Sequence, residues 1–120
     1  MTTKEFESTV KAFIEEIQHA RKKRDFELLE SLSGDLKNYL WNHAAEFKGF
    51  SEYCERIPKG FLSQNRTLAK ERAKGKCELC GKRGTQTHHL CGRSPLKVYH
   101  LSELLIYLCC ECHGKFHGGG

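Results

Sequence analysis

The sequence predicts an α+β fold, with helices in the N-terminal half and two short strands and a final helix in the C-terminal half. Apolar residues recur at helical spacing through the first part of the 120-residue chain. From Lys76 onward, closely spaced cysteines and histidines alternate with short apolar runs. We therefore divide the chain into a helical region, residues 1–65, to which the sequence assigns no function, and residues 66–120, a basic helix followed by the module rich in cysteine and histidine.

The N-terminal region contains two clear helical patterns. A helix is expected over residues 3–23, because one face repeats an apolar residue at Phe6, Val10, Phe13, Ile14 and Ile17. A second helix begins near Phe26 and is expected to stop at Ser33-Gly34. It restarts at Asp35, since aspartate is a favoured N-cap residue. Trp41 lies beside the apolar face of this last segment, and we expect it in the core.

Five further elements are predicted downstream from apolar spacing and from glycine and proline punctuation. They are helices over residues 50–57 and 63–74, strands over residues 85–90 and 104–108, and a last helix that begins near Cys110.

The formal net charge of +5 is concentrated in one stretch of the chain. Residues 66–97 carry nine Lys and Arg against two acidic residues, whereas residues 1–65 carry ten against eleven. Such a stretch is either a solvated basic helix or a surface that faces a polyanion, because neutralising phosphates releases counterions. In the second case the expected phosphate contacts are Arg66, Lys70, Arg72, Lys74, Lys76 and Arg93.

The sequence also indicates a compartment. The N-terminal residues lack the apolar core of a secretory signal, and no apolar run reaches the length of a membrane span. The seven cysteines are an odd number. We therefore expect a cytoplasmic protein without a membrane partner, in a reducing environment where paired cysteines more often bind metal than form disulfides.

Two C-x2-C pairs, Cys77/Cys80 and Cys109/Cys112, offer four thiolates to one metal ion. This short spacing lets both sulfurs of a pair reach the same tetrahedral zinc. The 28 residues between the pairs exceed the usual ribbon spacing and must therefore carry structure of their own. Two local disulfides or free thiols are the alternatives to a structural Zn²⁺.

The histidines near the second pair suggest a second metal site. His113 and His117 are spaced i, i+4, so on a helix they share one face and can hold a single ion together. The insert between the cysteine pairs contains the adjacent histidines His88 and His89. A third imidazole from that strand would leave the ion with open positions, as catalytic metals require.

The order of these motifs resembles the HNH endonuclease family, the ββα-metal nucleases. The similarity consists of C-x2-C, then His88-His89 followed by a hydrophobic residue and Gly-Arg, then LC-x2-CH-x3-H. It covers roughly Lys76 to His117 and no part of residues 1–65. The resemblance implies that the C-terminal module is a ββα-metal module stapled by zinc.

The resemblance also implies an activity, a metal-dependent hydrolysis of DNA phosphodiester bonds. His88, His113 and His117 would hold the catalytic divalent ion, and His89 would be the general base that deprotonates the attacking water. Manganese or magnesium is expected to support turnover, and a neutral imidazole site also suits zinc or nickel. A single centre in a monomer would nick one strand per event, with low sequence specificity.

One position departs from the family pattern. The family asparagine falls on Leu104, whose side chain cannot hold the base by a hydrogen bond. His100, Ser102 and Glu103 are the candidates to replace it, with His100 first because imidazole both donates and accepts. This departure keeps two alternatives open, a non-catalytic zinc-stabilised nucleic-acid-binding module and a zinc-ribbon domain that binds protein.

Overall fold

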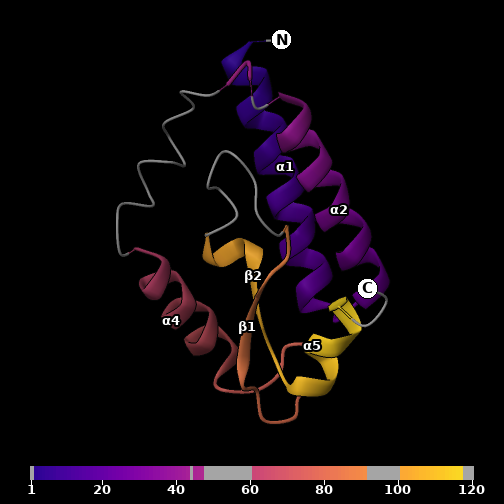
Figure 1. Ribbon diagram of the computed structural model, residues 1–120, viewed down its shortest axis with the longest axis vertical. Helices are drawn as coiled ribbons and strands as arrows, with labels where there is room; N and C mark the ends of the chain where they lie inside the picture. The colour runs from indigo at the N-terminus through magenta and orange to yellow at the C-terminus, as the bar shows by residue number, and fades with distance from the viewer. Residues whose placement is uncertain (1, 44, 48–60, 92–100, 118–120) are drawn as a thin grey trace.

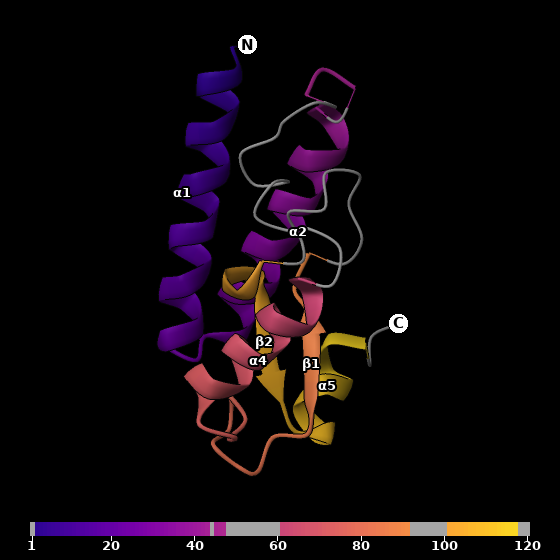
Figure 2. The same cartoon turned by 90° about the vertical axis from the view of Figure 1, so that its left-hand side faces the viewer.

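The architecture is a small two-stranded sheet enclosed between helices. In this computed structural model, residues 2–43, 45–47, 61–91 and 101–117 are described. These residues form four α-helices, a short 3-10 turn and one antiparallel sheet, which confirms the α+β prediction. Figures 1 and 2 show three layers: α4 covers one face of the sheet, and α1 and α2 lie over the other. The helix predicted over residues 50–57 falls outside the described residues.

The helix α1 (Thr3–Lys22) closely matches the predicted 3–23. Its first turn is closed by a capping box, in which the Thr2 hydroxyl accepts from the Glu5 backbone N–H at 3.1 Å and the Glu5 carboxylate accepts from the Thr2 N–H at 3.2 Å. The predicted apolar face is buried, with Phe13 partly so. This face packs against α2, so the two helices form an antiparallel hairpin (Figure 1).

The helix α2 (Phe26–His43) is continuous, and the predicted break at Ser33-Gly34 is wrong. The buried Ser33 hydroxyl donates to the Leu29 carbonyl one turn earlier at 2.6 Å, so its polar group is satisfied inside the helix. Gly34 lies on the exposed side, where a Cβ would meet no atom within 4 Å. Packing of Leu29, Leu36 and their neighbours against α1 therefore outweighs the weak helix propensity of these two residues.

The expectation that Trp41 lies in the core is also wrong. Its side chain belongs to the solvent side of α2 and is 56% exposed. The aromatic cluster beside it is instead built on Phe6, which stacks on Tyr39 at 5.5 Å and on Phe47 at 4.2 Å between ring centroids.

The sheet is a hairpin of β1 (Gln86–His89) and β2 (Leu105–Leu108), both within the predicted strands. In the antiparallel register His88 pairs with Ile106 and His89 pairs with Leu105. The 3-10 turn η2 (Ser102–Leu104) leads into β2, and helix α5 (Cys110–His117) follows it, beginning where the sequence predicts.

The two faces of β2 pack against different helices. Leu104, Ile106 and Leu108 join the main hydrophobic core with α1 and α2. Leu105 and Tyr107 are buried outside that cluster, on the face covered by α4 (Phe61–Ala73). The helix α4 crosses the boundary that the charge pattern places at residue 65. No helix within the described part of the chain is long and apolar enough to cross a bilayer.

Candidate metal centres

Four cysteines meet at one end of the hairpin, and they are the four predicted from the C-x2-C pairs. The Sγ atoms of Cys77, Cys80, Cys109 and Cys112 all lie within 4.8 Å of one another. The two pairs approach closely, with 3.5 Å between the Sγ atoms of Cys80 and Cys109. The six described cysteines form no disulfide with one another. These four thiols can hold a metal ion together.

The first pair sits on a tight turn between α4 and β1. The Cys77 N–H donates to the Lys82 carbonyl at 2.6 Å, and the Gly81 N–H donates back to the Cys77 carbonyl at 2.9 Å. Gly81 has a φ of 79°, a left-handed conformation that glycine adopts without strain. The glycine after the second cysteine therefore allows both sulfurs to face the same point.

The second pair begins α5, which places two sulfurs at the helix start. The Cys112 N–H points at the Cys109 sulfur at 3.5 Å. Burial opposes ionisation of Cys77, but backbone N–H groups from Cys80, Cys109 and Leu79 outweigh it and lower the pKa of Cys77 to about 6. Burial first, and then hydrogen bonds to the other thiols of the cluster, raise the pKa of Cys112. The cluster thus favours a first thiolate and resists further ionisation unless a cation is bound.

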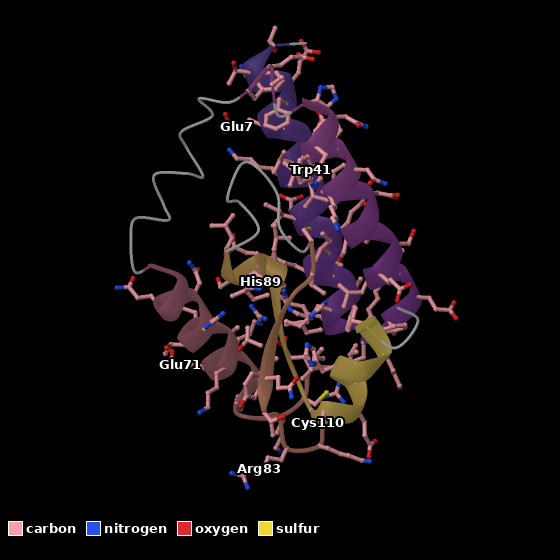
Figure 3. All side chains as sticks on the ribbon, in the orientation of Figure 1. Glu7, Trp41, Glu71, Arg83, His89 and Cys110 are labelled. Atoms are coloured by element: carbon pink, nitrogen blue, oxygen red, sulfur yellow. The ribbon has the colours of Figure 1, made fainter. Side chains whose placement is uncertain are left out.

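The donor set fits a structural zinc. A tetrahedral zinc with Zn–S distances of about 2.3 Å separates its sulfurs by about 3.8 Å. The observed cluster is close to that size. The two other cysteines among the described residues stay outside it. Cys91 is fully buried, and burial raises the pKa of its thiol to about 12. Cys110, labelled in Figure 3, is exposed and lies near Thr85 and Gln86.

Two of the predicted imidazole ligands lie side by side. The ring of His88 on β1 is 5.2 Å from the ring of His113 on α5, measured between centroids, with the planes inclined by 67°. Two imidazoles bound to one tetrahedral ion at about 2.1 Å have centroids about 5 Å apart. Both side chains are partly exposed. His117 is the last residue of α5, and its side chain lies outside the described residues.

An aromatic ring supports this pair from one side. Phe116 stacks on His88 at 4.7 Å between centroids and contacts Phe26 of α2 edge-on at 4.9 Å. The ring therefore connects the imidazole of β1 to the N-terminal hairpin. This contact restricts the orientation of His88 and covers part of its surface.

His89 lies on the opposite face of the hairpin from His88. Neighbouring residues of a strand point to opposite faces, and the partner of His89 is Leu105, on the face that α4 covers. Figure 3 shows His89 near the end of β1 beside η2. The predicted general base therefore does not share a face with His88, because β1 stays regular through both histidines instead of ending between them.

Leu104, which stands where the HNH pattern has an asparagine, is part of the hydrophobic core. Leu104 is fully buried, and its carbonyl accepts from the Leu90 N–H at 3.0 Å. Of the suggested replacements, the Ser102 hydroxyl bonds to the Glu103 carboxylate at 2.9 Å. His100 and the predicted phosphate contact Arg93 lie outside the described residues.

One predicted phosphate contact has an internal role. Arg72 donates to both carboxylate oxygens of Glu78 at 3.1 and 2.7 Å and to the carbonyls of Ser102 and Leu105 at 2.8 and 2.7 Å. Four of its five N–H donors are thereby used inside the protein. Most of the hydrogen-bonding capacity of Arg72 is thus used inside the protein, although the residue is exposed, and its predicted contact with phosphate stays a prediction. The other described members of the predicted set are exposed as well: Arg66, Lys70, Lys74 and Lys76.

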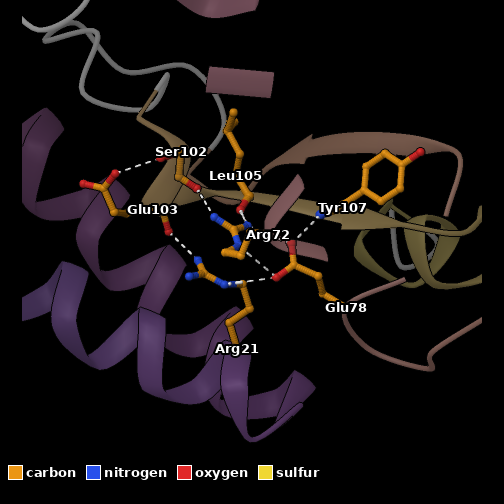
Figure 4. A network of polar contacts seen from close by, with 7 residues as sticks. All are labelled: Arg21, Arg72, Glu78, Ser102, Glu103, Leu105 and Tyr107. Atoms are coloured by element: carbon orange, nitrogen blue, oxygen red, sulfur yellow. Dashed lines mark hydrogen bonds and ion pairs between the residues drawn. The ribbon is translucent and has the colours of Figure 1, made fainter. Parts of the chain in front are cut away.

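The hydrogen-bond network around Glu78 includes a second arginine, Arg21, which the sequence analysis did not single out. Figure 4 shows Arg21 of α1 joining Arg72 at Glu78, with 3.2 Å between the Arg21 Nε and the carboxylate. Arg21 is only 4% exposed. The signal was present in the sequence, since Arg21 follows Ile17 by four residues and so continues the apolar face of α1. A cation on a buried stripe predicts a buried acceptor.

Comparison with known proteins adds no relative. No family model matches the chain, and no curated protein or solved structure matches it significantly.

Proposed function

We propose that the protein is a metal-dependent nuclease that hydrolyses phosphodiester bonds of DNA. The observation that carries the proposal is the contact between His88 and His113, which come from different elements and meet beside the four-cysteine cluster. In this proposal the four thiols hold a structural zinc, and the imidazoles hold a second, catalytic divalent ion. The ββα-metal arrangement suggested by the motif order is supported by the hairpin β1–β2 followed directly by α5.

The catalytic ion would be held by His88 and His113, with His117 as the third ligand that the sequence suggests. When bound, a divalent ion supplies Lewis-acid stabilisation of the charge that develops on the phosphate and the leaving oxygen. Phe116 fixes the His88 ring, so the protein presents one ligand in a set orientation. His89 has no direct place at this ion, because it lies on the other face of β1.

Plasmid nicking tests the proposal. Supercoiled plasmid is incubated with manganese and the zinc-loaded chain, and the open-circular product is measured. We expect nicking by the wild type and by His19→Ala, a matched control on the exposed side of α1. His88→Ala and His113→Ala should lower the rate at least about 100-fold, a loss of about 2.7 kcal/mol of transition-state stabilisation. Each variant must retain one zinc per chain.

The result that would refute the proposal is nicking that survives His88→Ala, or a wild type that never nicks with manganese, magnesium, zinc or nickel. His89→Ala is informative in addition. A large loss in that variant would mean that β1 rearranges to bring His89 to the ion, whereas an unchanged rate would assign the base to another group.

The second candidate function is a zinc-stabilised nucleic-acid-binding module without catalysis. The burial of Leu104 at the asparagine position and the separation of His88 from His89 favour it. The binder predicts salt-dependent DNA affinity with no nicking in any metal. It also predicts that His113→Ala leaves DNA affinity unchanged.

A further inference from the structure

A basic cleft of about 420 Å³ lies where the C-terminal ends of α1 and α4 meet the first cysteine pair. This volume is within the usual range of small-ligand sites. Six of its nine lining residues are Lys or Arg, and the single carboxylate is that of Glu78. The basic residues are Arg21, Lys22, Arg24, Arg72, Lys74 and Lys76.

The carboxylate of Glu78 has no capacity left for another cation. It accepts from Arg72 at two points, from the Arg21 Nε at 3.2 Å and from the Tyr107 N–H at 3.0 Å. These four donors match the four lone-pair sites of a carboxylate. One negative charge therefore contacts two guanidinium groups (Figure 4). With six basic residues and one carboxylate in its lining, the cleft keeps an excess of positive charge.

Arg21 has hydrogen-bonding capacity that the described contacts do not use. Its Nη1 donates to the Glu103 carbonyl at 2.8 Å and its Nε faces Glu78, but no described acceptor meets its Nη2. Burial, followed by repulsion from Arg72, lowers the pKa of Arg21 to about 10 against the attraction of Glu78 and Glu103. An anion in the cleft, which Arg21 and Arg72 both line, would offset this repulsion.

Two cleft cations occupy strained backbone positions. Arg24 and Lys74, which follow the ends of α1 and α4, have φ values of 57° and 55°. Glycine is the usual residue at such positions, because residues with a Cβ adopt this conformation only at a cost in free energy. Both side chains line the same cleft. Both strained positions are occupied by a basic residue where glycine would be unstrained. The Arg24 and Lys74 side chains are therefore expected to have a role beyond ending the helices.

We propose that this cleft binds a phosphate group of a nucleic-acid backbone. The exposed residues Arg66 and Lys70 of α4 precede Lys74, which directly follows the end of the helix, at intervals of four residues. The helical rise over these eight residues is about 12 Å, so the row leads to the cleft. A row of that length matches a linear polyanion better than a single small anion. This proposal rests on the proposed function only in taking the phosphate to be part of a nucleic acid. It adds the C-terminal end of α1 to the surface that would contact DNA.

Fluorescence anisotropy of a labelled 20-base-pair duplex tests it, with the zinc-loaded full chain and no added manganese or magnesium. The test variant is the double substitution Arg24→Gly/Lys74→Gly, since glycine suits both φ values and the fold should be as stable as the wild type or more so. The control is Lys4→Gln/Lys37→Gln, which removes the same charge from exposed positions of α1 and α2.

A plot of log affinity against log salt concentration has a negative slope. We expect this slope to be shallower by about two in the test variant than in the wild type, and to be unchanged in the control. Between 50 and 200 mM salt the wild type should lose about tenfold more affinity than the test variant. Inorganic phosphate should raise the melting temperature of the wild type and not of the test variant.

Two outcomes of the anisotropy measurement would overturn the proposal: a test variant whose salt slope equals that of the wild type, or a control whose salt slope falls as much as that of the test variant. Stabilisation by phosphate with unchanged duplex affinity would equally overturn it, by assigning the cleft to a small phosphorylated ligand. Because no catalytic metal is present, failure of plasmid nicking and failure of this binding test are separate results.

Discussion

The substitution Glu78→Gln tests whether one carboxylate joins the N-terminal helices to the cysteine module. Glu78 lies between Cys77 and Cys80, its side chain is 11% exposed, and it contacts Arg21 of α1 and Arg72 of α4. Glutamine keeps the size and one acceptor oxygen but removes the charge. Two guanidinium groups would then share a buried site without a counterion.

The magnitude follows from the burial of the partners. Removing one member of a buried ion pair costs about 3–5 kcal/mol, because it leaves the other charge unpaired. Arg21 is buried, but the Arg72 side chain is 28% exposed, so solvent screens part of its loss. We therefore expect Glu78→Gln to lower the free energy of unfolding by about 2–4 kcal/mol.

Urea unfolding of zinc-loaded protein, followed by circular dichroism, measures this difference, and zinc content is checked for each variant. The matched control is Glu111→Gln, because Glu111 contacts Lys82 at 3.4 Å with both side chains mostly exposed, and no measurable change is expected there. Equal stability of Glu78→Gln and wild type, with zinc retained, would contradict the reasoning. It would mean that the two guanidinium groups do not depend on this carboxylate.

Three further predictions concern single residues. Gly34→Ala should stabilise the protein by about 0.5–1 kcal/mol, because alanine adds helix propensity at a site with open space; a loss of stability by thermal melting would show that α2 is not continuous there. Gly84→Ala should instead destabilise by about 1–3 kcal/mol, since its Cβ would come within 2.3 Å of the Tyr107 ring; an unchanged melting temperature would contradict this packing. Cys112→Ser should abolish stoichiometric zinc binding, measured by elemental analysis, and destabilise the module by about 3 kcal/mol or more. Cys110→Ser, from the same helix but outside the cluster, should keep one zinc, and equal zinc in both variants would count against the four-cysteine site.

Local patterns in the sequence were sufficient for much of the fold. The buried face of α1 is determined by residues four apart, and its start is fixed by Thr2 and Glu5, so neither depends on distant contacts. The four-cysteine cluster was predictable for a similar reason, because a C-x2-C pair limits how its sulfurs can be arranged. The strands were predictable as short apolar or histidine-rich runs between turn residues.

The wrong or incomplete predictions share one cause. In each case contacts with other parts of the fold determine what a residue does, and local sequence does not reveal those contacts. The break at Ser33 was expected because serine and glycine are weak helix formers, but packing of Leu29 and Leu36 against α1 keeps α2 continuous. Arg72 was assigned to solvent or phosphate from its place in a basic run; it is exposed, but its bonds to Glu78 and to two backbone carbonyls could not be predicted from that run. Spacing predicts which face a residue occupies, and it does not tell which neighbour will cover that face.

The pleat explains why the candidate site was only partly predictable. Adjacent histidines suggested a shared centre, but the regular register of β1 places His88 toward α5 and His89 toward α4. The contact between His88 and His113 could not come from helical spacing, since it joins residues 25 positions apart on different elements.

The four-cysteine cluster joins the chain segments that carry the two candidate sites, the His88–His113 pair and the basic cleft. Cys77 and Cys80 precede β1, which carries His88, and Cys109 and Cys112 flank the start of α5, which carries His113. One ion bound by all four sulfurs would therefore fix the distance between the imidazoles. The same turn carries Glu78, which holds the end of α1 against the basic cleft. Removing a bound zinc should consequently separate the imidazole pair, which contains no cysteine, and loosen the cleft, which Cys77 lines. For this reason the N-terminal hairpin is better regarded as part of the functional unit than as an appended domain.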